Sequence, residues 1–242
     1  MSVPSAARPQ GLHPVSLGRR SLDLVLGGTA LVLALPLLLV AAAAILLLDG
    51  RPLLHRAVRV GEGGYPFVVP KLRTMRQDPS GPGVTAAGDA RITSLGRVLR
   101  RLSIDELPQL WCVVRGRMTL VGPRPESAEL AARYPAPCRP VLLERPGLTG
   151  PAQLRYRERS ATPPPGWDVE RWYLEVLVPL RVRADLDFLG RATVRETVRW
   201  LVMTGLFVTG LRDPSEPPVD GPLGSRAATA PRTPPRAGRT AR

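Results

Sequence analysis

The uncharged run from Leu24 to Leu48 constrains this chain more than any other feature of its sequence. As an α-helix it would be roughly 37 Å long, which is enough to cross a hydrocarbon core of ~30 Å. A cleaved signal peptide does not explain the run, because no small-residue cleavage site precedes a mature domain. The sequence therefore predicts a helix that sits in a membrane.

The arrangement of this helix in the membrane is open from the residues alone. Pro36 lies at the centre of the run, and a proline inside a helix removes a backbone hydrogen bond and bends the helix. Arginines flank the run on both sides, so positive charge does not select an orientation. Two arrangements fit: a kinked single pass, and a re-entrant helix that turns at Pro36 and returns to the same face.

Composition divides the rest of the chain. We expect a disordered N-terminal tail over residues 1–18, a membrane helix broken at Pro36 over 19–50, and a disordered Pro/Arg-rich tail over 213–242. Residues 51–212 alternate short apolar runs with turn signals, which predicts one small, mixed α+β globular domain.

Local patterns predict several elements of that domain. Residues 65–75 read as an extended segment, and residues 78–90 read as a loop. Ile92–Leu102 has the periodicity of an amphipathic helix. Val113–Val121 reads as a hairpin that turns at Arg115 and Gly116. The apolar face that begins at Val194 predicts a helix that lies either at the membrane interface or in the core.

Charge is the second constraint. The formal net charge is +14, which points to a polyanionic partner such as a phosphorylated substrate, an anionic membrane or a nucleic acid. The membrane run and the lack of aromatics interleaved with the basic residues argue against nucleic acid. The two cysteines and two histidines have no zinc-ligand spacing, so histidine or zinc chemistry is not expected.

The adjacent carboxylates Asp105 and Glu106 stand out within this basic chain. Neighbouring like charges repel each other unless cations or a metal ion offset them, and arginines, which suit phosphate, surround the pair in the sequence. Lys71 is the single lysine among the 34 Lys and Arg residues, which suggests a position that needs a compact ammonium. The two interpretations are a solvated salt-bridge cluster and a carboxylate pair that works on a phosphate ester.

Several sequence blocks together resemble the bacterial sugar transferase family, the small monotopic phosphoglycosyl transferases. The resemblance covers residues 19 to about 211 and includes Arg19-Arg20-x-x-Asp23 ahead of the helix with Pro36. The blocks within the domain are KLRTM (71–75), DARITSLGR (89–97), RRLSIDELPQL (100–110), Gly116-x-Met118, VGPRP (121–125) and RPGLTG (145–150).

The resemblance implies an enzyme that starts exopolysaccharide, capsule, O-antigen or glycan synthesis. Such an enzyme transfers a sugar-1-phosphate from a UDP-sugar to undecaprenyl phosphate, releases UMP and requires Mg²⁺. Asp105 would be the nucleophile that forms a covalent phosphosugar intermediate, and Glu106 would share the metal and activate the nucleophile. The implied substrate-binding residues are Lys71, Arg73, Arg100, Gln109, Arg124, Pro125 and Gln153.

The resemblance also implies a place in the cell. It favours the re-entrant helix, with interfacial amphipathic helices and the catalytic domain on the cytoplasmic face of the bacterial inner membrane. Membrane lipid is an expected partner, nucleic acid is not, and a homo-oligomer stays open. The alternative is a non-catalytic basic protein that binds anionic lipid or glycan-assembly partners.

Four positions depart from the family pattern, one of which is Glu196, where an aspartate is common. Arg117 and Thr119 stand where members have Asp and Ser, and Pro151 replaces a frequent tryptophan. None of these positions touches the Asp105–Glu106 pair in the sequence. The departures therefore leave the identity of the sugar in doubt more than the activity.

Overall fold

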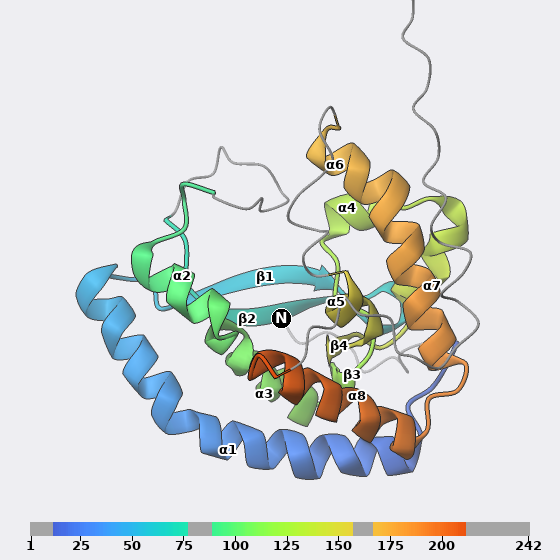
Figure 1. Ribbon diagram of the computed structural model, residues 1–242, viewed down its shortest axis with the longest axis horizontal. Coiled ribbons are helices and arrows are strands. Elements are labelled where there is room, and N and C mark those ends of the chain that lie inside the picture. The colour runs from blue at the N-terminus through green and yellow to red at the C-terminus, as the bar shows by residue number, and fades with distance from the viewer. Residues whose placement is uncertain (1–11, 77–88, 157–166, 212–242) are drawn as a thin grey trace, which may run out of the picture.

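The computed structural model describes residues 12–76, 89–156 and 167–211, and mixes helices with two small sheets (Figure 1). This confirms the predicted α+β class. Most of the predicted loop 78–90, most of the N-terminal tail and the predicted C-terminal tail fall outside the described residues.

Helix α1, Leu17–Leu48, is the longest described element and runs along one side of the domain (Figure 1). It begins two residues before the predicted start, because Ser16 caps its first turn through a hydrogen bond from the Arg19 amide. The helix is not interrupted at Pro36. It continues to Leu48 as one curved helix, so the predicted break is a bend.

Only one stripe of α1 packs on the domain. The buried positions recur at helical spacing and are Arg19, Asp23, Gly27, Ala34, Ala41 and Ile45. Apolar side chains such as Leu33 and Leu47 remain 72% and 82% exposed. Among the described helices, α1 is the one long and apolar enough to cross a membrane, and its exposed apolar surface is consistent with membrane association.

Two polar residues attach α1 to strand β3, Thr119–Val121. The Arg19 Nη2 atom donates to the Val121 carbonyl at 2.7 Å, and its Nε donates to the Thr197 hydroxyl at 3.1 Å. Asp23 Oδ1 accepts from the Thr119 hydroxyl at 3.0 Å and from the Leu120 amide at 2.8 Å. The apolar helix and the strand that leads into the VGPRP segment are therefore joined by buried hydrogen bonds.

Two-stranded sheets order the middle of the domain. Strands β1, Leu54–Val60, and β2, Pro66–Leu72, pair antiparallel around the single helical turn η1, Glu62–Gly64, which confirms the extended segment predicted there. Strand β3 pairs in parallel with β4, Gly147–Thr149. The strand β4 lies within the RPGLTG block.

The hairpin predicted over Val113–Val121 is wrong. Leu110–Val114 forms the short helix α3, and Arg115 and Gly116 end this helix instead of turning a hairpin. Arg20 of α1 donates to the carbonyls of Val113 and Val114 at 2.7 and 2.6 Å, so a distant residue satisfies the end of α3. A short apolar run does not distinguish a strand from a buried helical turn.

The remaining helices lie around this frame. The predicted amphipathic helix is α2, Ser94–Arg101, and the predicted C-terminal helix is α8, Val194–Val208. Between β3 and α8 the other described helices are α4, Ala128–Ala132; the 3-10 helix η3, Ala136–Leu143; and α5, Pro151–Arg155. They are followed by α6, Val169–Trp172, the π-helical turn η4, Tyr173–Leu177, and α7, Val178–Leu189, which adjoin one another in the chain.

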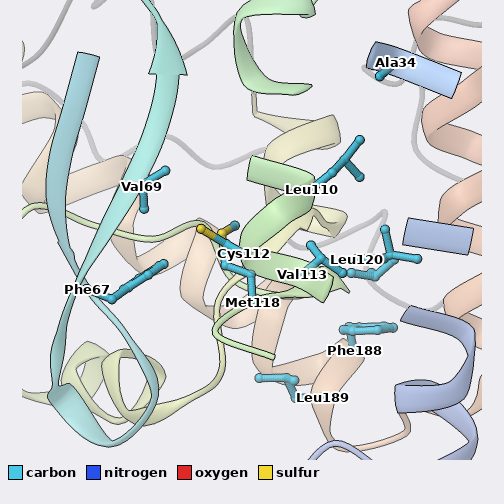
Figure 2. Close-up of a cluster of buried hydrophobic side chains, with 11 residues drawn as sticks. Ala34, Phe67, Val69, Leu110, Cys112, Val113, Met118, Leu120, Phe188 and Leu189 are labelled. Carbon is cyan, nitrogen blue, oxygen red and sulfur yellow. The ribbon is translucent and has the colours of Figure 1, made fainter. Parts of the chain in front are cut away.

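The largest buried cluster joins α1, β2, α3, β3 and α7 (Figure 2). Val113, Met118 and Val121 are fully buried at its centre. Helix α8 packs on this core through Trp200 and Leu201. Its valine stripe at 194, 198 and 202 stays 40–56% exposed, which favours the interfacial alternative over a buried core helix.

Candidate active site

Helix α2 lies directly against the end of β2. Thr93 caps the helix by accepting from the Gly96 amide at 2.9 Å. A Cβ on Gly96 would lie 2.1 Å from the Thr74 carbonyl oxygen, so only glycine allows this approach. The approach lets Arg100 Nε donate to the Thr74 hydroxyl at 2.8 Å and brings Arg100 to the β2 side of the domain.

A left-handed residue then turns the chain into the carboxylate pair. Ser103 has φ 56° and ψ 21°, a conformation that is uncommon without glycine and that ends α2 after Arg101. The short 3-10 helix η2, Ile104–Gln109, follows and carries Asp105 and Glu106 in its first turn. Pro108 lies inside this helix, which continues to Gln109 and is followed directly by α3.

Glu106 forms the centre of an ion-pair cluster. Lys71 Nζ lies 2.7 Å and Arg124 Nη2 lies 3.2 Å from the same oxygen, Glu106 Oε1. Burial on its own would raise the pKa of Glu106, but Arg124 and Lys71 outweigh it and lower the pKa to about 2. Glu106 therefore stays ionised at any physiological pH.

Asp105 has the opposite electrostatic character. Its side chain is buried, and burial together with the charge on Glu106 raises its pKa above the usual value, against the opposing charges of Lys71 and Arg100. A desolvated carboxylate is a stronger nucleophile than a hydrated one, and two adjacent carboxylates with divergent pKa values are typical of sites where each has its own role. The single lysine of the chain thus neutralises one carboxylate and lies close to the other.

The close packing of two glycines positions Arg124. Gly122 follows β3 and Gly147 opens β4, and a Cβ on Gly147 would lie 2.1 Å from the Gly122 amide nitrogen. The segment Pro123–Pro125 follows Gly122 in the chain, and its two prolines restrict its backbone. Arg124 is exposed, and its guanidinium reaches back to Glu106.

Not every predicted site residue joins this cluster. The Arg73 guanidinium donates to the carbonyls of Asp49, Gly50 and Arg51, so its hydrogen bonds hold the end of α1 and do not go to the carboxylate pair. Gln109 in η2 and Gln153 in α5 are inward-facing, and the Nε2 atom of each has no hydrogen-bond partner among the described residues. Their roles in substrate binding stay predictions, as does that of Pro125.

The departures from the family pattern lie away from the carboxylates. Thr119 is buried, and its hydroxyl donates to Asp23 in the contact between α1 and β3. Arg117 is exposed between α3 and β3, and Pro151 is the buried first residue of α5. The hydroxyl of Thr119 therefore has a structural partner.

The donor set of the pair fits a hard cation that is shared with a substrate. Two carboxylates are available, and both cations on Glu106 contact the same oxygen, Oε1, which leaves Oε2 for a metal. Among the described residues there is no group of three or more His, Cys, Asp or Glu side chains that could hold a metal alone. Mg²⁺ commonly uses one or two carboxylates and completes its shell with phosphate oxygens and water, so the residues fit such an ion.

Arg124 also lines a pocket that the sequence motifs do not predict. Its polar lining includes Glu126, Tyr134, Arg181 and Asp185. The two residues from α7, Arg181 and Asp185, were missed because no motif marks them in the sequence, and their place depends on how α7 packs on the segment after Arg124.

Comparison with known proteins agrees with these features. The sequence profile of the bacterial sugar transferase family matches residues 15–209. The UDP-glucose:undecaprenyl-phosphate glucose-1-phosphate transferase of Caulobacter vibrioides is 48% identical over 199 residues, which cover 75% of this chain and 67% of that protein. The Escherichia coli protein of the same name is 34% identical over 79% of this chain, but the match spans only 39% of its length.

A third relative comes from a polysaccharide pathway. The exopolysaccharide production protein ExoY of Rhizobium meliloti is 36% identical over 63% of this chain and 73% of its own length. The profile match covers α1, the carboxylate pair, both cations on Glu106 and α8. The chain therefore belongs to the bacterial sugar transferase family.

Proposed function

We propose that this chain transfers a sugar-1-phosphate from a UDP-sugar to undecaprenyl phosphate and releases UMP. The observation that carries the proposal is the pairing of buried Asp105 with Glu106, which is held by Lys71 and Arg124, on a domain fastened to a long apolar helix. The names of the relatives support the same reaction.

The residues suggest a two-step displacement. In the first step a carboxylate oxygen of Asp105 attacks the phosphorus that carries the sugar, and the bond from this phosphorus to the bridging oxygen breaks, so that UMP leaves with that oxygen. In the second step an oxygen of undecaprenyl phosphate attacks the same phosphorus. The bond to Asp105 then breaks and its carboxylate is regenerated.

The neighbouring groups would stabilise charge during both steps. Lys71 and Arg124 fix Glu106 and add positive charge beside the reacting phosphate, and Arg100 adds a further positive charge near Asp105. Asp105 and Glu106 would hold Mg²⁺, which supplies additional positive charge to the phosphate oxygens when bound.

A substrate panel tests this function. Membranes that contain the protein should release UMP from at least one UDP-sugar when undecaprenyl phosphate and Mg²⁺ are present, and UDP-glucose is the first sugar nucleotide to try, because two relatives are named for it. Membranes without the protein are the control. Should no member of the panel yield UMP, the non-catalytic alternative, a basic surface protein that binds anionic lipid, would replace the enzyme.

The membrane arrangement is part of the proposal, and labelling can test it. With a re-entrant α1, both the N-terminus and the domain lie on the cytoplasmic face, so Ser5→Cys should stay hidden from an impermeant thiol reagent in intact cells. The native cysteines 112 and 138 are buried and give little background. Glu129→Cys, on the exposed side of α4, is a matched control that should label only after permeabilisation. Ready labelling of Ser5→Cys in intact cells would support a spanning helix.

A further inference from the structure

Arg181 shares a pocket with the arginine that contacts Glu106. Arg124 lines one part of this pocket and Arg181, on α7, lines another. Glu106 raises the pKa of Arg124. Arg181 is close enough to Arg124 for its positive charge to act in the opposite direction. The arginine that contacts Glu106 therefore has a second arginine near it, which comes from a helix far away in the sequence.

A tyrosine fixes the position of Arg181. Arg181 Nη1 donates to the Tyr173 hydroxyl at 2.8 Å, and its guanidinium carbon lies 5.5 Å from the centroid of the same ring. The Tyr173 hydroxyl donates in turn to Glu126 Oε2, two residues after Arg124. The side chain that holds Arg181 is thus tied to the segment that carries Arg124.

Arg181 keeps most of its donors available for a ligand. Within residues 12–76, 89–156 and 167–211, no carboxylate lies within 4.0 Å of its guanidinium nitrogens, and Tyr173 engages only one of those nitrogens through a hydrogen bond. A guanidinium with a free fork of donors and no ion-pair partner suits a phosphate group.

Within the described part of the chain the acidic residues of the pocket form no ion pair with Arg181, and their hydrogen bonds go to other groups. Glu126 Oε2 accepts from the hydroxyls of Tyr134 and Tyr173, and its Oε1 accepts from the Ser127 amide. Asp185 Oδ1 accepts from the Ala152 amide, and burial raises the pKa of Asp185 to about 7, so the group is partly protonated at neutral pH.

We propose that Arg181 binds the phosphate of the UMP leaving group. The inference rests on the proposed function, in which Asp105 attacks the phosphate that carries the sugar and Arg124 lies beside that phosphate. A diphosphate then places its second phosphate away from Asp105, and this phosphate gains negative charge as the bridging bond breaks. Arg181 lines the same pocket as Arg124 and would supply positive charge to this second phosphate.

Product inhibition tests the assignment. Arg181→Gln should raise both the KM for the UDP-sugar and the inhibition constant of UMP by roughly 10- to 100-fold, the loss typical of a charged hydrogen bond. Inhibition by uridine, which lacks the phosphate, should not change. Arg183→Gln is the matched control, because Arg183 is an exposed arginine on the same helix, and it should leave all three constants within about twofold of the wild type.

Three results would overturn the assignment. Arg181→Gln could behave like Arg183→Gln, it could weaken uridine as much as UMP, or it could raise only the KM for undecaprenyl phosphate, which would place the acceptor phosphate at Arg181. If Arg181→Gln does not fold, Arg181→Lys decides by the ratio of the UMP to the uridine inhibition constant: an increased ratio supports the assignment and an unchanged ratio refutes it. Wild-type protein that releases no UMP would instead remove the proposed function itself.

Discussion

Replacing Asp105 with asparagine is expected to reduce UMP release by at least about a thousandfold, because an amide does not attack phosphorus as a carboxylate does. Asparagine has nearly the same shape as aspartate, and burial together with the charge of Glu106 already disfavours a negative charge at this position. The variant should therefore fold and enter the membrane at least as well as the wild type. The measurement is the initial rate of UMP release at equal protein in the membrane.

A second aspartate provides the control for this variant. Asp187→Asn changes the same functional group on α7, outside the carboxylate pair, and should keep the wild-type rate within about threefold. If Asp105→Asn turns over at a rate near that of the control, the nucleophile lies elsewhere.

Replacing Glu106 with glutamine should have the second largest effect, a loss of roughly 10²- to 10³-fold in turnover. The substitution removes the charge on which Lys71 and Arg124 converge and leaves two cations without their partner. It also removes one of the two proposed Mg²⁺ ligands, so saturation should require more Mg²⁺.

The pH–rate profile of Glu106→Gln is expected to shift in a definite direction. The negative charge of Glu106 raises the pKa of Asp105, so its removal lowers that pKa. The acid limb of the pH–rate profile, which reflects protonation of the nucleophile, should then move to lower pH. Glu129→Gln, an exposed position on α4, should leave the profile in place. An acid limb that stays put or moves upward in Glu106→Gln would contradict the coupling between the two carboxylates.

Local sequence identified the centre of the site but not its surroundings. Asp105 and Glu106 are adjacent in the chain, and Lys71 and Arg124 belong to sequence blocks of the family. We could therefore expect Lys71 and Arg124 to lie beside the carboxylate pair. Arg73 belongs to the same block as Lys71, yet its guanidinium contacts the end of α1, because the chain returns there after the β1–β2 hairpin. Only the tertiary arrangement separates these two roles.

The elements that were predicted wrongly failed for a similar reason. The run Val113–Val121 has the apolar residues of a hairpin, but Arg20 satisfies the end of α3 and β4 supplies the partner strand of β3. Both partners come from distant parts of the chain. Arg181 was missed because helical periodicity says which residues share a face but not which segment that face meets.

Intact-protein mass spectrometry tests the central claim most directly. Purified wild-type protein and Asp105→Asn would be incubated with the accepted UDP-sugar and Mg²⁺, without undecaprenyl phosphate. The mass of each intact protein would then be measured. The account predicts that the wild type gains the mass of one sugar phosphate while UMP appears, and that Asp105→Asn gains nothing. A sugar phosphate attached to Asp105→Asn, or a wild-type enzyme that turns over without ever carrying one, would contradict it.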